Sequence, residues 1–67
     1  MSRFKQYIQY IQNAGSAATP DNFIDDWEPI GFMVLNDMKQ DGLINLPIVA
    51  SETITLTDKG LEVLGND

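Results

Sequence analysis

The hydrophobic positions near the N-terminus repeat with the period of an α-helix. They are spaced at i, i+3, i+4 and i+7, and they comprise Phe4, Tyr7, Ile8 and Ile11. This spacing places apolar side chains on one face, so we predict an amphipathic helix over residues 3–14. Ser2 is placed to cap this helix, and Gly15 to end it in a left-handed conformation. Tyr10 lies beside the apolar face, either as a rim residue of the core or as a contact in a dimer.

A second helix is indicated by a strong start signal. Thr19-Pro20-Asp21 supplies a hydroxyl N-cap, a proline at the first helical position and an acid in the first turn. Phe23, Ile24 and Trp27 follow with apolar helical spacing, and we expect Trp27 to be a core anchor. The small residues 15–18 are the predicted connector between the first two helices.

A third helix is predicted to begin at Pro29, with Glu28 or Asp26 as its cap, and to end before Gly42. Glycine inside a helix is less favourable than alanine by ~1 kcal/mol, so Gly31 indicates that another element packs closely there. The helix holds more apolar residues than one face can bury. These residues are Ile30, Phe32, Met33, Val34, Leu35 and Met38.

The pattern after the third helix alternates as in a β-hairpin. Residues 43–50 are the predicted first strand, and Pro47 requires a sheet edge or a bulge there. One face of this strand carries Ile44, Leu46 and Ile48. Residues 51–52 are the expected tip, and the return strand points Ile54 and Leu56 inward.

A short last helix is predicted over residues 58–64, with Thr57 as its cap. Leu61 and Leu64 are expected to dock on the core. Residues 65–67 should fray, because chain ends without apolar side chains are held by few contacts.

Length and composition bound the class of protein. Sixty-seven residues allow a single domain, residues 1–67, with a modest core. The chain contains neither cysteine nor histidine, which excludes disulfides, thiolate metal sites and an imidazole base. No apolar run approaches the roughly 20 residues that span a bilayer, and the polar N-terminus is unlike a secretory signal. We therefore expect a cytoplasmic protein without a membrane partner.

The charge is strongly acidic, with ten acidic residues, four basic residues and a net charge of −6. Nucleic-acid-binding proteins gain affinity from Lys and Arg side chains that displace phosphate counterions. This charge therefore disfavours a nucleic-acid partner. The acids do not form a calcium motif either, because no Asp-x-Asp-x-Asp-Gly spacing occurs.

The order helix, short strand, helix, helix, hairpin, helix resembles the winged-helix superfamily, especially small bacterial regulators of the MarR and PadR kind. The resemblance covers nearly the whole chain. Its most specific parts are Asp41-Gly42-Leu43-Ile44 after the third helix and Ile54-Thr55-Leu56-Thr57-Asp58-Lys59-Gly60-Leu61 after the wing. It implies an α+β fold, namely a small winged-helix domain with three helices, a β-hairpin wing and a short C-terminal helix. A short third strand would come from residues 15–18.

The resemblance also implies which side of the third helix faces outward. The positions that it directs toward the core are Gly31, Val34, Leu35 and Met38. The outward positions are Ile30, Phe32, Met33 and Asp37. DNA-binding members present polar or basic side chains from this helix to the major groove. An apolar patch with methionine and an aromatic ring is instead typical of a protein-binding surface, the alternative being that Phe32 and Met33 are buried in the core.

We therefore expect a non-enzymatic regulatory module that acts by protein–protein interaction or by homodimerisation. The predicted interface residues are Tyr10, Ile30, Phe32, Met33 and Asp37. The alternatives are a DNA-binding transcription regulator or an acidic DNA mimic that antagonises a nucleic-acid-binding protein. The predicted DNA contacts of the regulator are Asn36, Lys39, Gln40, Ser51 and Thr53. The sequence lacks a nucleophile paired with a base and a phosphate-binding loop, so we expect no catalytic residue, cofactor, metal or small-molecule substrate.

Overall fold

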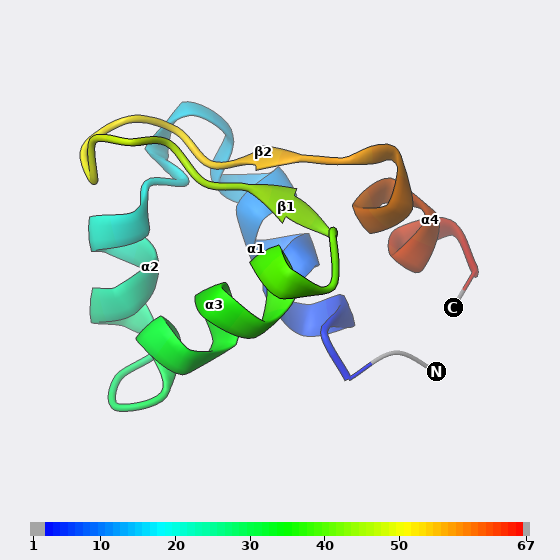
Figure 1. The fold of residues 1–67 in the computed structure, drawn as a ribbon, viewed down its shortest axis with the longest axis horizontal. Coiled ribbons are helices and arrows are strands. Elements are labelled where there is room, and N and C mark those ends of the chain that lie inside the picture. The colour runs from blue at the N-terminus through cyan, green and yellow to red at the C-terminus, as the bar shows by residue number, and fades with distance from the viewer. Residues whose placement is uncertain (1–2, 67) are drawn as a thin grey trace.

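Four α-helices and a two-stranded antiparallel sheet make up an α+β fold in the described part of the chain (Figure 1). The structure is a computed structural model that describes residues 3–66. Its elements are α1 (Lys5–Ala14), the 3-10 helix η1 (Gly15–Ala17), α2 (Pro20–Asp26), α3 (Gly31–Gln40), β1 (Ile44–Asn45), β2 (Thr55–Leu56) and α4 (Asp58–Asn66). The α+β class predicted from the sequence is therefore confirmed.

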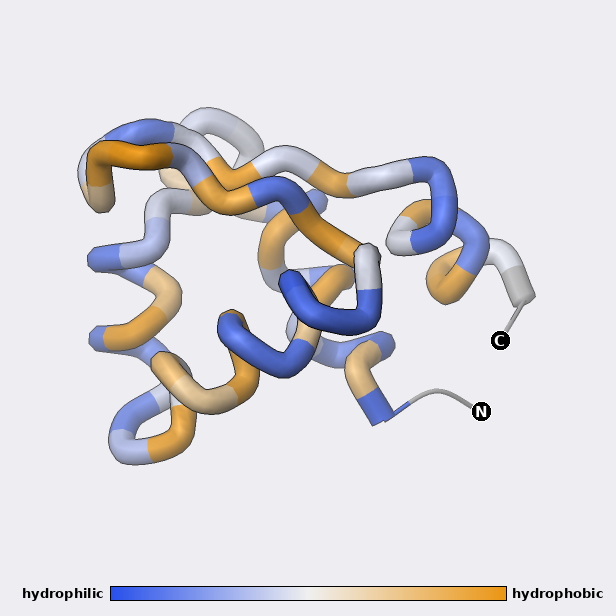
Figure 2. The backbone as a smooth tube through the Cα atoms, in the orientation of Figure 1, coloured by the Kyte–Doolittle hydropathy of each residue, from blue (hydrophilic) through white to orange (hydrophobic). Residues whose placement is uncertain are grey.

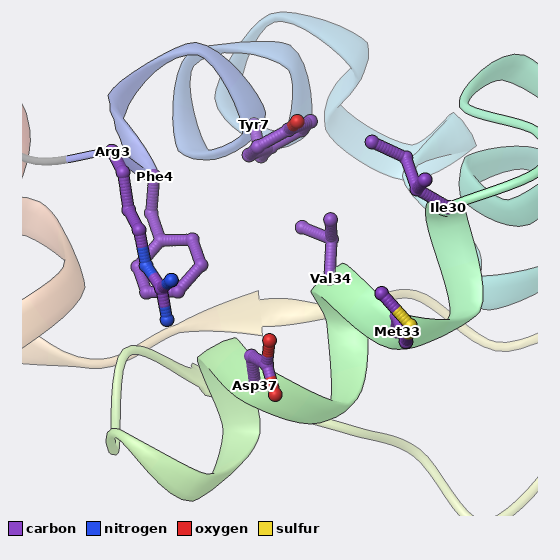
Figure 3. A pocket seen from close by; sticks show the side chains of 7 residues that line it. All are labelled: Arg3, Phe4, Tyr7, Ile30, Met33, Val34 and Asp37. Carbon is purple, nitrogen blue, oxygen red and sulfur yellow. The ribbon is translucent and has the colours of Figure 1, made fainter.

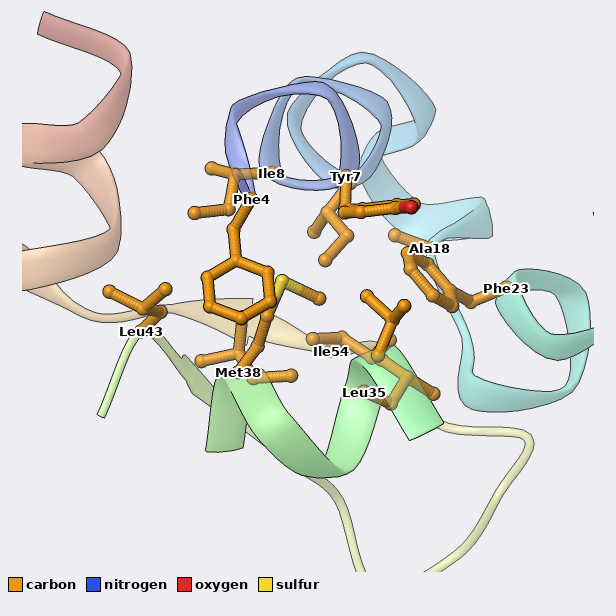
Figure 4. Close-up of a cluster of buried hydrophobic side chains, with 12 residues drawn as sticks. Phe4, Tyr7, Ile8, Ala18, Phe23, Leu35, Met38, Leu43 and Ile54 are labelled. Atoms are coloured by element: carbon orange, nitrogen blue, oxygen red, sulfur yellow. The ribbon is translucent and has the colours of Figure 1, made fainter. Parts of the chain in front are cut away.

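The core lies between α1, α3 and the sheet, and α2 closes one side of it (Figure 4). The predicted apolar face of α1 is confirmed, because Phe4, Tyr7, Ile8 and Ile11 are all buried. The helix begins at Lys5 with Phe4 as its N-cap, two residues later than predicted. The expected cap Ser2 lies outside the described residues. Gly15 ends the helix with a positive φ of 58°, a conformation that glycine adopts readily.

The connector after α1 is helical, so the short strand expected over residues 15–18 is wrong. Local backbone hydrogen bonds hold it, including one from Ala18 to Gly15 of 3.1 Å. Ala18 still meets the return strand, because its carbonyl accepts a hydrogen bond of 2.7 Å from the Ile54 amide. Backbone groups in this connector therefore hydrogen-bond mainly to one another, and not along a neighbouring strand as a third strand would require.

The start of α2 is as predicted. Thr19 caps the helix by accepting a hydrogen bond of 3.2 Å from the Asn22 amide, and Pro20 is the first helical residue. The helix packs against α3 at the predicted glycine. A Cβ atom at Gly31 would lie only 2.8 Å from the Cα of Ile24. Close backbone contact between α2 and α3 therefore requires glycine at this position.

The third helix begins at Gly31 rather than at Pro29, so the predicted start is wrong. Residues 27–30 form a turn in which the Ile30 amide donates a hydrogen bond of 3.0 Å to the Trp27 carbonyl. Ile30 occupies the N-cap position, and no side chain caps the helix. The predicted caps are therefore wrong as well. The Glu28–Pro29 peptide bond within this turn is cis.

The hairpin is shorter than predicted. Its strands pair only Ile44 with Leu56 and Asn45 with Thr55. Residues 46–54 form a loop that reaches the start of α2 in Figure 1. The Ala50 carbonyl accepts a hydrogen bond of 3.3 Å from the Asp21 amide, which ties the loop to the start of α2.

The alternation predicted over residues 43–50 does not continue to Ile48, because this side chain is fully exposed whereas Ile44 is buried. Side chains alternate in direction only where β1 is paired with β2. Pro47 lies beyond the paired residues and has no amide hydrogen to donate to a neighbouring strand. On the return strand the prediction holds. Ile54 is buried, and Leu56 packs against the core.

Thr57 caps α4 as predicted, since its hydroxyl oxygen accepts a hydrogen bond of 3.1 Å from the Gly60 amide. Gly60 packs directly on the backbone of Leu43. This contact sets the rotation of the helix, so Val63 and Leu64 pack on the core. The inward position predicted for Leu61 is wrong, because that side chain is exposed.

The last helix also extends further than predicted. It runs to Asn66, so Gly65 and Asn66 are helical rather than frayed, while Asp67 lies outside the described residues. Within residues 3–66 the helices are all too short or too polar to cross a membrane.

Candidate functional site

Large apolar side chains are exposed around the start of α3. The exposed fractions are 41% for Ile30, 70% for Phe32 and 63% for Met33. We call these three residues the α3 patch. The opposite face of the helix is buried and comprises Gly31, Val34, Leu35 and Met38, the positions expected to face the core. Figure 2 shows that the hydrophobic start of α3 gives way to a hydrophilic end. The same helix therefore supplies the core on one side and open apolar surface on the other.

A groove of about 240 Å³ lies beside two residues of the α3 patch, Ile30 and Met33, between α3 and the N-terminal end of α1 (Figure 3). Its α1 side is formed by Arg3, Phe4 and Tyr7, and its α3 side by Ile30, Met33, Val34 and Asp37. The patch therefore continues into a concave, largely apolar surface. The groove depends on contact between two helices that are far apart in sequence. The spacing of residues within α1 gave no signal for it.

One end of the groove is charged. The Arg3 guanidinium lies over the Phe4 ring, 4.6 Å from its centroid, which is a cation–π geometry. Asp37 lies toward the same end in Figure 3, while Ile30 lies at the other. Within residues 3–66 the Asp37 carboxylate has no hydrogen-bond or ion-pair partner. Among the described residues, this carboxylate is therefore open to a cation from a partner.

Tyr10 occupies the rim of the core, which is one of the two roles that the sequence left open. Its ring makes edge contacts with Phe23 and Trp27, with centroid distances of 5.6 and 5.8 Å. Its hydroxyl donates a hydrogen bond to the Asp26 carboxylate. That bond, together with burial and the negative charge of Asp26, raises the pKa of Tyr10 to about 12. An interface role for Tyr10 stays a prediction.

Trp27 anchors the turn between α2 and α3, in agreement with the prediction of a core anchor. Its ring packs edge-on against Tyr7 with a centroid distance of 4.7 Å. The side chain is half-buried, and its indole nitrogen is buried without a hydrogen-bond partner in the described part of the chain. Trp27 therefore links the turn that precedes the α3 patch to the core.

The residues predicted to contact DNA in the alternative function lie in two segments, and their role stays a prediction. All of them are exposed: Asn36, Lys39, Gln40, Ser51 and Thr53. The first three lie in the second half of α3, whereas the other two lie in the loop over residues 46–54 (Figure 1). The Thr53 hydroxyl donates a hydrogen bond of 3.3 Å to the Ser16 carbonyl. The loop also exposes Ile48 and Val49, which the alternating pattern placed in a strand.

Comparisons with protein-family models, with curated proteins and with solved structures found no match for this chain. Within residues 3–66 there is no group of three or more Asp and Glu side chains placed to hold a metal ion. The geometry and charge of the α3 patch and its groove are therefore the basis for a functional proposal.

Proposed function

We propose that this protein is a small, non-enzymatic winged-helix module that acts in regulation by binding another protein through the α3 patch. The observation that carries the proposal is the exposure of Phe32 and Met33 at the start of a helix whose other face is buried. Burying a large apolar side chain contributes about 1.5–3 kcal/mol relative to leaving it in water. A partner that covers both side chains gains this contribution, and the adjoining groove gives it a concave contact.

The winged-helix part of the proposal is supported by the order of the elements. A pair of helices is followed by an antiparallel hairpin and a closing helix. The Thr57 hydroxyl donates a hydrogen bond of 2.5 Å to the Gly42 carbonyl, so the end of α3 and the end of the wing are joined. These are the two stretches in which the sequence most resembles that superfamily.

The chemistry of α3 favours protein over DNA as its partner. The helix that reads bases in DNA-binding winged-helix proteins here exposes Phe32 and Met33 in its first turn. Base edges are read by hydrogen-bonding side chains such as Arg, Lys, Asn and Gln. The net charge of −6 also opposes approach to a polyanion.

The test is site-specific photo-crosslinking in cells that naturally make the protein. The photoreactive residue p-benzoylphenylalanine replaces Phe32 in the full chain, and a control places it at Gln12, an exposed position on the polar face of α1. We expect a covalent adduct with a second protein from position 32 and not from position 12. Adding Met33→Lys should remove that adduct.

Two results would count against the proposal. Equal labelling from positions 12 and 32 would show that contact is random. Tight, steeply salt-dependent binding of random-sequence duplex DNA by the unmodified protein would favour a DNA-binding regulator instead.

A further inference from the structure

Open apolar surface and acidic surface lie together around α3. We infer that the partner of the α3 patch presents a cationic amphipathic helix. The apolar side of that helix enters the groove between α1 and α3, and its Lys or Arg side chains face Glu28 and Asp37. This inference rests on the proposed function and adds the chemistry of the partner.

The apolar part of the site is long enough to contact two turns of a partner helix. Ile30, Met33 and Asp37 are spaced at i, i+3 and i+7, so they lie along one side of α3. Seven residues at 1.5 Å each cover about 10 Å, which is two helical turns. Amphipathic helices bind hydrophobic grooves through apolar anchors at the same spacing. A partner helix can therefore place two apolar anchors beside Ile30 and Met33, and a charged side chain one turn further, at Asp37.

The charge around the patch is negative on both sides. Glu28 precedes it in an exposed position, and Asp37 follows it at the groove. Six of the ten acidic residues lie between Asp21 and Asp41, and Lys39 is the one base in that stretch. Charge complementarity speeds encounter and suppresses partners of the wrong sign. The surface therefore selects a cationic partner.

Arg3 is the basic residue that lines the groove. Its position leaves the preference for a cationic partner in place. Its guanidinium lies over the Phe4 ring on the α1 side. The Asp37 carboxylate lies on the α3 side and has no ion-pair partner within residues 3–66. A cation from the partner would therefore supply a charge partner that residues 3–66 do not give Asp37.

A second copy of this chain fits the patch less well. In a symmetric dimer the same surface occurs on both subunits. Pairing two α3 patches would bring Glu28 and Asp37 of each copy near those of the other, and like charges facing each other disfavour association. A cationic helix from another protein meets the same apolar side chains without this repulsion.

The experiment uses two labelled synthetic peptides of about 14 residues, which is roughly four helical turns. One is an amphipathic Leu/Lys helix, and the other has the same Leu positions with Glu in place of every Lys. Fluorescence anisotropy measures the binding of each peptide to the whole protein at low and high salt. We expect binding of the Leu/Lys peptide that weakens with added salt, and at least tenfold weaker binding of the Leu/Glu peptide.

Matched variants locate the contact. Met33→Ser, which changes an exposed side chain that lines the groove, should weaken binding of the Leu/Lys peptide about tenfold, the effect of losing roughly 1.4 kcal/mol. Glu28→Gln and Asp37→Asn should each weaken it about threefold, in the range of exposed ion pairs. Glu62→Gln removes the same charge from an exposed position on α4 and should change nothing. Circular dichroism of each variant checks that its fold is retained.

The inference is overturned if both peptides bind equally, or if Glu62→Gln weakens binding as much as Asp37→Asn. A crosslinked partner whose contacting segment is acidic or uncharged would also overturn it, while leaving the proposed interaction module intact. Absence of any adduct at position 32 would instead remove the proposed function.

Discussion

The hydroxyl of Tyr10 donates a hydrogen bond to the carboxylate of Asp26, which joins α1 to the end of α2. Asp26 is the last residue of α2 and does not cap α3, and the chain turns through residues 27–30 before that helix begins. The same bond raises the pKa of Tyr10 to about 12. The position of the α3 patch is therefore connected to a contact between the first two helices.

This pKa predicts how stability changes at high pH. An unfolded tyrosine ionises near pH 10. The folded protein holds the proton more tightly, so the contribution of Tyr10 is fully present below about pH 10 and is lost as the pH rises toward 12. We expect the free energy of unfolding to fall more steeply in this range for the natural protein than for Tyr10→Phe. Denaturant titrations followed by the fluorescence of Trp27 measure the difference.

The control for the Tyr10 prediction is Asp26→Asn, which keeps an acceptor and removes the charge. It should bring the pKa of Tyr10 closer to its ordinary value in an ultraviolet titration. At neutral pH, Tyr10→Phe should lower the free energy of unfolding by about 0.5–1.5 kcal/mol, the usual range for one hydrogen bond. Identical pH profiles for Tyr10→Phe and the natural protein would contradict the assignment.

Two methionines on α3 test which side of the helix is buried. Met38 is fully buried, whereas Met33 is 63% exposed. We expect Met38→Ala to lower the free energy of unfolding by about 2–5 kcal/mol, because it leaves a cavity in the core. The same change at Met33 should alter it by less than about 0.5 kcal/mol. Thermal denaturation of both variants gives the comparison, and a large loss for Met33→Ala would mean that the α3 patch belongs to the core.

Gly31→Ala should destabilise the protein although alanine is the better helix former. The added Cβ would meet the Cα of Ile24 at 2.8 Å, so the two helices must move apart. Overpacking of this kind costs about 1–3 kcal/mol, more than the ~1 kcal/mol gained in helix propensity. The matched control is Gly65→Ala in α4, where the new Cβ has open space. Urea denaturation should show a loss for the first variant and no loss for the second.

Thr57→Val tests the hydrogen bonds at the junction between the hairpin and α4. The hydroxyl caps α4 through the Gly60 amide and donates a hydrogen bond to the Gly42 carbonyl. Removing it should lower the free energy of unfolding by about 1–2 kcal/mol, in the range measured for lost N-caps. Thr55→Val makes the same change at an exposed strand position and should have little effect. If both variants lose the same stability in denaturant titrations, the capping role of Thr57 is refuted.

The features predicted well from the sequence depend on neighbouring residues. The caps at Thr19 and Thr57 follow from side chains that hydrogen-bond within three residues. The buried side of α3, including Leu35 and Met38, is predicted from the resemblance to winged-helix proteins around Gly42, since apolar spacing alone does not choose a side of this helix. Phe32 is assigned to the outward side in the same way, and its side chain is exposed. These parts of the fold and of the candidate site need no knowledge of distant contacts.

The features predicted poorly depend on distant contacts. The turn over residues 27–30 that precedes α3 holds Trp27 against Tyr7, twenty positions earlier in the chain. Leu61 is exposed because packing of Gly60 on Leu43 sets the rotation of α4. The α1 side of the groove was missed because helical spacing does not show which helix lies opposite Met33. Propensity and periodicity are weak where tertiary packing decides the outcome.

The brevity of β1 and β2 limits the strand edge that this protein offers to other chains. Long, open strand edges are templates on which other chains can add and grow into fibrils. Here only two residues of each strand are paired, and the residues beyond them turn away into a loop. A strand edge this short offers a neighbouring molecule few backbone groups with which to pair. The exposed apolar side chains, such as Phe32, therefore do not lie beside a long strand edge that could start fibril formation.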